Sequence, residues 1–119
     1  MSNPVFQFQI ISKDPEATGQ FYSELFGWTI TADNMTGHRI INTGSREGIQ
    51  GGIWLAPPQA PNFVQLFVAV DDVSGAVRTA EAQGARVLVG PTPLPEGDEM
   101  AVMQDPQGMA FALCRRAGK

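Results

Sequence analysis

The sequence predicts an α+β fold made of two paired βαβββ modules, whose curled mixed sheet surrounds a cleft. Three observations support this prediction. Strand-like and helix-like segments recur in the same order twice, the two helical segments align without a gap, and a proline-rich segment separates the halves. We expect a single domain over residues 1–119, with modules at about 4–55 and 62–115, because 119 residues give room for one core.

The first predicted strand, "VFQFQII" at residues 5–11, has polar residues without charge. Alternation places Gln7 and Gln9 on one face with Val5 and Ile11, and it places Phe6, Phe8 and Ile10 on the other. A solvent-exposed face normally carries charged side chains. The lack of charge here leaves two alternatives: the face is exposed to water, or it lines a cavity in which a neutral amide has a role.

A helix should follow at residues 14–27. Asp14 is suited to the N-cap, Pro15 to the first helical position and Gly27 to the C-terminal stop. We expect the aromatic rings of this helix to pack on the apolar face of the first strand: Phe21, Tyr22 and Phe26 on Phe6, Phe8 and Ile10.

Three strand-like runs complete the first half, namely "WTITA", "HRIINTG" and "GIWLA" at residues 28–32, 38–44 and 52–56. The segment "APPQAP" at residues 56–61 cannot continue a central strand, because proline lacks the backbone N–H. It is typical of a linker between the two halves.

The second half repeats the first. A strand at 63–70 precedes a helix capped by Asp71 or Asp72 and closed by Gly84, and three strands follow at 85–90, 99–105 and 109–114. Aligning Asp14 with Asp71 also aligns the helix-ending glycines, and with an offset of one it aligns Gln7 with Gln65. Each module would bury one sheet face under its helix, and the other faces would enclose the cleft.

Composition excludes several partners. The net charge is −4 and the only basic cluster is "CRRAGK" at the C-terminus, which argues against nucleic acid. No apolar run is long enough for a membrane span, and the N-terminus has no secretory signal. The one cysteine, Cys114, cannot form an internal disulfide and should be a buried apolar residue, so we expect a cytoplasmic protein.

The motifs "FYSELFGW" near the start and "DPQG" near the end, together with the repeat, resemble the vicinal oxygen chelate superfamily. This superfamily includes glyoxalase I, bleomycin-resistance proteins, fosfomycin-resistance enzymes and extradiol dioxygenases. The resemblance covers about residues 4–114 and implies the glyoxalase/bleomycin-resistance fold. It does not decide the function, because the superfamily includes metalloenzymes and metal-free binding proteins.

In the metalloenzymes of that superfamily, four strands each supply one metal ligand. The resemblance assigns these four positions to Gln7, Trp54, Gln65 and Ala112, with Trp54 at or next to its position. Two amides, an indole and a methyl group cannot replace the His, Cys, Asp and Glu ligands that a divalent cation needs. We therefore expect no metal and no cofactor.

The predicted cleft walls suit a small, uncharged or weakly charged, partly planar organic ligand. They comprise Gln7, Gln9, Trp54, Gln65, Phe67 and Ala112. The amides of Gln7 and Gln65 need partners, which are each other, water or the ligand. The resemblance implies a homodimer, and related metal-free members bind small organic molecules, including drugs.

Three functions remain open on the sequence. The first is a metal-independent small-molecule binding protein that sequesters a toxic compound or antibiotic. The second is an enzyme of glyoxalase, isomerase or dioxygenase type with an atypical metal site, for instance with Glu96, Asp98 or His38. The third is an interaction module with a vestigial cleft. Acidic residues in "PLPEGDEM" are more simply a solvated turn than a cation site.

Overall fold

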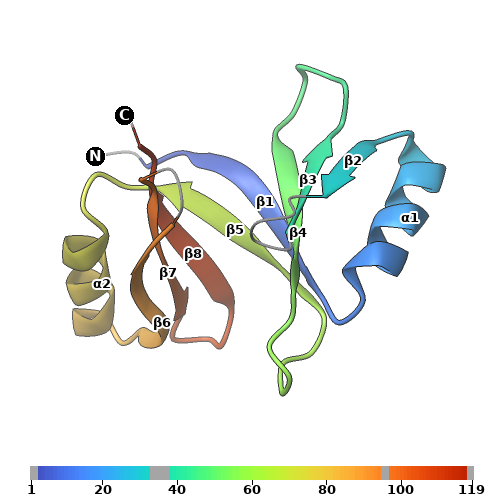
Figure 1. Cartoon of the computed structure of the whole chain (residues 1–119). Helices are drawn as coiled ribbons and strands as arrows, with labels where there is room; N and C mark the ends of the chain where they lie inside the picture. The colour runs from blue at the N-terminus through green and yellow to red at the C-terminus, as the bar shows by residue number, and fades with distance from the viewer. Residues whose placement is uncertain (1–2, 33–37, 95–96, 118–119) are drawn as a thin grey trace. The chain divides into compact units, whose positions relative to one another are not determined.

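The computed structural model describes residues 3–32, 38–94 and 97–117. The chain divides into two compact units, one of residues Gln7–Val64 and one of Met1–Phe6 with Gln65–Lys119. Figure 1 shows the helices and strands of both units along the chain.

The Gln7–Val64 unit is a mixed sheet with one helix. In chain order it contains β1 (Val5–Ser12, which begins in the other unit), α1 (Pro15–Phe26), β2 (Thr29–Ala32), β3 (Arg39–Asn42) and β4 (Gln50–Leu55). The strand order is β2-β3-β4-β1, in which β1 and β4 are parallel and the other two pairs are antiparallel.

The ends of α1 lie where the sequence predicts them. The Asp14 carboxylate accepts a hydrogen bond from the Ala17 backbone N–H at 3.1 Å, which satisfies one of the free donors of the first turn. Gly27 adopts φ 73°, and its N–H donates to the Ser23 carbonyl at 2.9 Å. The helix packs on β2 and β4 at Gly19, where a Cβ would be 3.5 Å from the Ile30 side chain and 3.6 Å from that of Ile53.

The second unit repeats this plan. It contains β5 (Phe63–Ala69, whose first two residues belong to the other unit), α2 (Val73–Ala82), β6 (Arg86–Pro93), β7 (Glu99–Gln104) and β8 (Ala110–Arg115). The order is β5-β8-β7-β6, with β5 and β8 parallel and the remaining pairs antiparallel. Asp72, one of the two predicted caps, accepts the Gly75 N–H at 3.1 Å.

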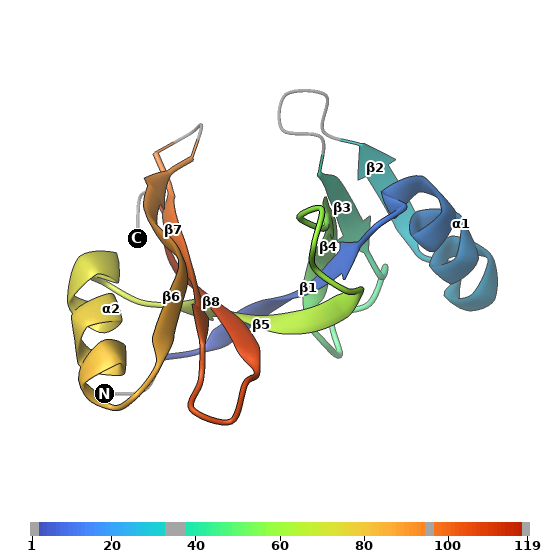
Figure 2. The ribbon, with the colours of Figure 1, turned by 90° about the horizontal axis from the view of Figure 1, so that it is seen from below.

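Helix α2 lies along one face of the sheet strands β6, β7 and β8 (Figure 2). A buried cluster joins the helix to this face: Val73, Val77, Ala101, Met103 and Leu113. Side chains alternate along β8, so the neighbours of Leu113 point to the opposite face. There Phe67, Ala112 and Cys114 form a second buried cluster.

The fold class is confirmed, because both halves have the order βαβββ and each contains parallel and antiparallel pairs. The division into a single domain stays a prediction. Among the described residues, no helix has the length and apolar character needed to cross a bilayer.

The predicted packing of the α1 aromatics is wrong in one respect. The ring of Phe6 stacks on Phe67, with ring centroids 4.9 Å apart, and it does not take part in the α1 cluster. The α1 rings instead gather around Trp28, on which Tyr22, Phe26 and Phe8 all pack. Phe21 and Phe26 stay 59% and 55% exposed. The reason is that β1 passes from one unit to the other between Phe6 and Gln7.

Candidate functional site

The strand pairing of the Gln7–Val64 unit separates two faces. A methyl group on Gly51 would overlap the Phe8 ring, and Ile53 meets Gly19 of α1, so these residues occupy the helix-covered face. In register, Gln7 pairs with Gln50 and Gln9 with Gly52. Alternation then gives the opposite side of β1 and β4 a set that we call the amide face: Gln7, Gln9, Gln50, Gly52 and Trp54.

The amide face brings together three of the predicted site residues, Gln7, Gln9 and Trp54. Gln9 is almost fully buried, with 1% of its surface exposed, whereas Gln7 and Trp54 are partly exposed. Gln7 and Trp54 can therefore contact a ligand directly, while Gln9 supports the floor between them.

A histidine joins this face. The imidazole of His38 stacks on the indole of Trp54, with ring centroids 4.3 Å apart and an angle of 13° between the planes. Gly52 lies beneath the pair, since a Cβ there would be 3.5 Å from His38 Cδ2 and 3.6 Å from Trp54 Nε1. These are ordinary contact distances, and the tight approach at Gly52 is to the Arg39 backbone oxygen, which a Cβ would meet at 3.1 Å.

The position of His38 was not predicted. The pairing of Ile40 with Gly52 and of Arg39 with Ile53 carries the residue before β3 toward Trp54. That register depends on the turn between β3 and β4, which the sequence alone did not reveal.

The side chain of Gln50 is bonded to this turn: its carbonyl accepts from the Thr43 N–H, and its amino group donates to the Ser45 carbonyl. Gln50 thus has a structural role.

The other three predicted site residues lie together in the second unit. Gln65 and Phe67 are on β5, and Phe67 pairs in register with Ala112 of β8. All three are buried, with 4%, 5% and 0% of their surface exposed. Phe6, Met100 and Val102 pack around Phe67 and Ala112, and the Arg116 guanidinium lies 4.3 Å from the centroid of the Phe6 ring.

Cys114 is a buried part of the same cluster, as predicted. Burial raises the pKa of its thiol from 9.0 to about 11, and the negative charge of Asp98 adds to the increase. Because the thiolate is the nucleophilic form, a thiol with this pKa is inert at neutral pH.

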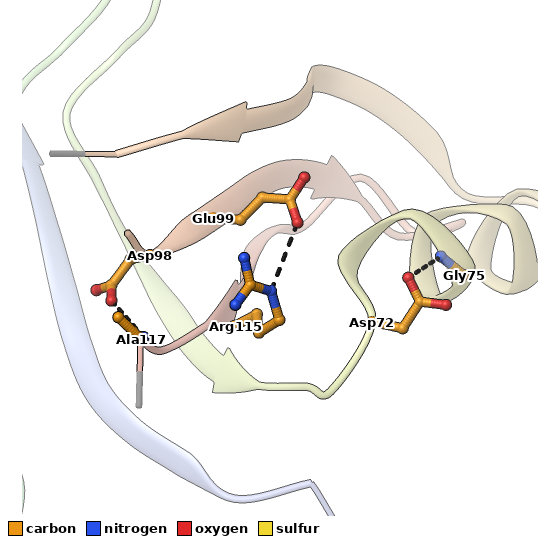
Figure 3. Close-up of polar contacts among 6 residues, drawn as sticks. All are labelled: Asp72, Gly75, Asp98, Glu99, Arg115 and Ala117. Atoms are coloured by element: carbon orange, nitrogen blue, oxygen red, sulfur yellow. Dashed lines mark hydrogen bonds and ion pairs between the residues drawn. The ribbon is translucent and has the colours of Figure 1, made fainter. Parts of the chain in front are cut away.

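The acidic turn has structural contacts (Figure 3). Asp98 accepts the Ala117 backbone N–H at 2.6 Å, and Glu99 lies 3.8 Å from Arg115 Nε in a partly exposed ion pair. Such pairs contribute little to stability. Glu96, the third acidic residue, lies outside the described residues.

The four residues that the resemblance assigns to metal-ligand positions are not usual ligands of a divalent cation. Gln7 and Gln65 offer neutral oxygens, Trp54 offers only an N–H donor and Ala112 offers no ligand atom. Within residues 3–32, 38–94 and 97–117, no three His, Cys, Asp or Glu side chains come close enough to hold a metal ion. This donor set is unlike a zinc or calcium site.

Comparisons with known proteins agree with this architecture. The profile of the family described as "Glyoxalase-like domain" matches residues 7–114. A candidate glyoxylase, CFP32, from Mycobacterium bovis is 28% identical over 113 residues, covering 92% of this chain and 42% of that protein. The anthracycline biosynthesis protein DnrV of Streptomyces peucetius is 30% identical over 125 residues, covering 92% and 46%. The chain therefore spans less than half the length of these curated relatives.

Among solved structures, a methylmalonyl-CoA epimerase from Mycobacterium tuberculosis superimposes with a TM-score of 0.63. The match covers 93% of this chain and 86% of that chain at 15% identity. An identity this low supports the fold alone.

Proposed function

Because this chain belongs to the glyoxalase-like domain family, we propose that it is a metal-independent small-molecule binding protein that sequesters a toxic or antibiotic compound. The observation that carries the proposal is the chemistry of the residues at the family's ligand positions, Gln7, Trp54, Gln65 and Ala112. Amide, indole and methyl groups are poor metal ligands, but they are well suited to contact a neutral organic molecule.

The proposed ligand is partly planar and uncharged or weakly charged. On the amide face, the partly exposed indole of Trp54 offers apolar contact and the amide of Gln7 offers a donor and an acceptor. Gln9 is the buried support of this face, and Gln65, Phe67 and Ala112, which are buried in the second unit, remain proposed ligand residues there. The name of the relative DnrV, an anthracycline biosynthesis protein, supports a flat polycyclic compound as the first class to test.

The remaining parts of the proposal concern surroundings and partners. We place the protein in the cytoplasm as a homodimer that binds neither nucleic acid nor membranes. The net charge of −4 supports the exclusion of nucleic acid. The lone cysteine is compatible with a reducing compartment.

A test of ligand binding can use Trp54 as the reporter. The Trp28→Phe variant has Trp54 as its only tryptophan, and 1,4-dihydroxyanthraquinone serves as a planar quencher. We expect saturable quenching. Gln7→Leu in the same background should weaken the affinity by roughly three- to tenfold, the equivalent of about one hydrogen bond. The matched control is Gln20→Leu, since Gln20 lies on the exposed surface of α1.

Quenching that is linear in the anthraquinone concentration would contradict the binding proposal. So would equal affinities of the Gln7→Leu and Gln20→Leu variants, because these would show that the amide face takes no part.

A second candidate function is an enzyme of glyoxalase, isomerase or dioxygenase type. The observation that favours it is the stacking of His38, the only histidine in the chain, on Trp54. Imidazole is the side chain best suited to move protons near neutral pH. Turnover of an aromatic or 2-oxo substrate that disappears in His38→Gln would favour the enzyme over the binding protein.

A further inference from the structure

A hollow of about 470 Å³ lies on the Gln7–Val64 unit. Its walls come from the end of β1 (residues 10–12), from α1 (residues 17, 18, 21 and 22), and from residue 62 with the first two residues of β5 (63 and 64). The five amide-face residues do not line it, but Ile11 does, and Ile11 lies on their side of β1. Its volume is within the range of about 300–1,000 Å³ that is usual for small-molecule sites.

The polar atoms at one end of the hollow are fixed in place. The hydroxyl groups of Ser12 and Thr18 are 2.6 Å apart, and Ser12 Oγ also accepts the Asp14 N–H at 2.9 Å. The side-chain carbonyl of Asn62 accepts the Lys13 N–H at 2.8 Å. This bond orients the Asn62 amide, and its Nδ2 makes no hydrogen bond to any residue that the structure describes. A donor is therefore held ready at the rim.

The rest of the lining is apolar and partly wet. Phe21 is 59% exposed and Val64 is 65% exposed, although both border the hollow. A ligand placed between them would remove apolar surface from water, which is favourable. Among the residues that the structure describes, no Asp, Glu, Lys or Arg side chain lines the hollow, so charge on the ligand would find no partner among them.

We propose that this hollow is a second small-molecule site, for an uncharged bicyclic or tricyclic compound that carries a ketone or a similar acceptor. The Asn62 Nδ2 donates to the acceptor oxygen, and the rings lie between Phe21 and Val64. This site is separate from the proposed amide-face site, because Thr18, Tyr22 and Asn62 line it and Gln7, Gln9 and Trp54 do not.

The two tryptophans allow the sites to be separated. Trp28 stacks on Tyr22, with ring centroids 5.7 Å apart and 22° between the planes, and Tyr22 lines the hollow. Trp54 belongs to the amide face. With 1-tetralone, a neutral bicyclic ketone, as the probe, amide NMR spectra should show saturable shifts at Thr18, Tyr22, Asn62 and the Trp28 indole N–H. The NMR signal of the Trp54 indole N–H should keep its chemical shift.

Two variants test the geometry. Ala17 is an exposed helical residue at the wall, and Ala17→Leu should fill the hollow and weaken 1-tetralone binding by roughly tenfold or more, because space for the rings is lost. Ala82→Leu makes the same change at an exposed position of α2 and should have no effect. Asn62→Asp keeps the acceptor for Lys13 but removes the donor, and should weaken binding by about five- to tenfold.

The proposal is overturned if no saturable shift appears up to the solubility limit of 1-tetralone. It is also overturned if the shifts map to the Trp54 indole, or if Ala17→Leu binds as well as Ala82→Leu. If 1-tetralone causes no shift at Trp28 while the anthraquinone still quenches Trp54, only the second site is refuted. If 1-tetralone causes the shifts while the anthraquinone does not quench Trp54, only the amide-face function is refuted.

Discussion

At the scale of single residues, chemistry follows from the surroundings of each side chain. His38 is placed against Trp54 by the strand register, because the pairing of Arg39 with Ile53 brings the preceding residue opposite Trp54. Cys114 shows the opposite case. It is 1% exposed, and the same burial that makes it part of the core suppresses its ionisation.

The first prediction concerns the Cys114 thiol, whose pKa rises to about 11 on folding. The unfolded chain loses this proton first as the pH rises from 9.0, so unfolding becomes more favourable between these two values. Two pKa units correspond to a loss of about 2–3 kcal/mol in the free energy of unfolding. Urea denaturation from about pH 8 to pH 11 should show this extra loss in the parent protein and not in Cys114→Ala. If the free energy of unfolding falls with pH equally in both proteins, the burial of the Cys114 thiol does not control its ionisation.

At the scale of elements, the edge strand β6 has the clearest consequence. It ends the order β5-β8-β7-β6, so one side of its backbone has no strand partner in this unit. Three consecutive apolar side chains on it are also exposed: Val87 by 38%, Leu88 by 48% and Val89 by 47%. Exposed apolar edges favour pairing with another chain, and in this protein the proposed partner is a second copy.

The second prediction is that β6 forms the homodimer interface. Leu88→Lys should shift the protein toward the monomer in sedimentation-velocity experiments, because two buried like charges would meet across a two-fold axis. Leu66→Lys is the matched control, since Leu66 is 53% exposed on β5 and should leave the dimer unchanged. A parent protein that sediments as a monomer at all concentrations tested would refute the dimer.

At the scale of the whole molecule, one plan is used twice with different contents. Both units have a capped helix on one sheet face, and the predicted site residues fall on the other strand faces. The repeat therefore preserves one framework, and the four side chains that we assign to metal-ligand positions by resemblance, Gln7, Trp54, Gln65 and Ala112, carry no charge.

The third prediction follows from those four side chains. Addition of Zn²⁺, Ni²⁺, Mn²⁺ or Fe²⁺ should leave the melting temperature unchanged, because a ligand that does not bind the folded state cannot stabilise it. Elemental analysis of the purified protein should find less than stoichiometric metal. Stoichiometric metal that is lost in Gln7→Ala or Gln65→Ala would disprove metal independence.

The sequence by itself determined the order of elements, the cap at Asp14, the helix stop at Gly27 and the buried state of Cys114, and it narrowed the second cap to Asp71 or Asp72. These features depend on neighbours in the chain or on strong apolar patterning, which local physics encodes. The tertiary structure decided the stacking of His38 on Trp54, the partnership of Phe6 with Phe67 and the hollow beside α1. Each of these joins segments distant in sequence, and strand register and chain direction, which fix such contacts, are set by long-range pairing rather than by local preference.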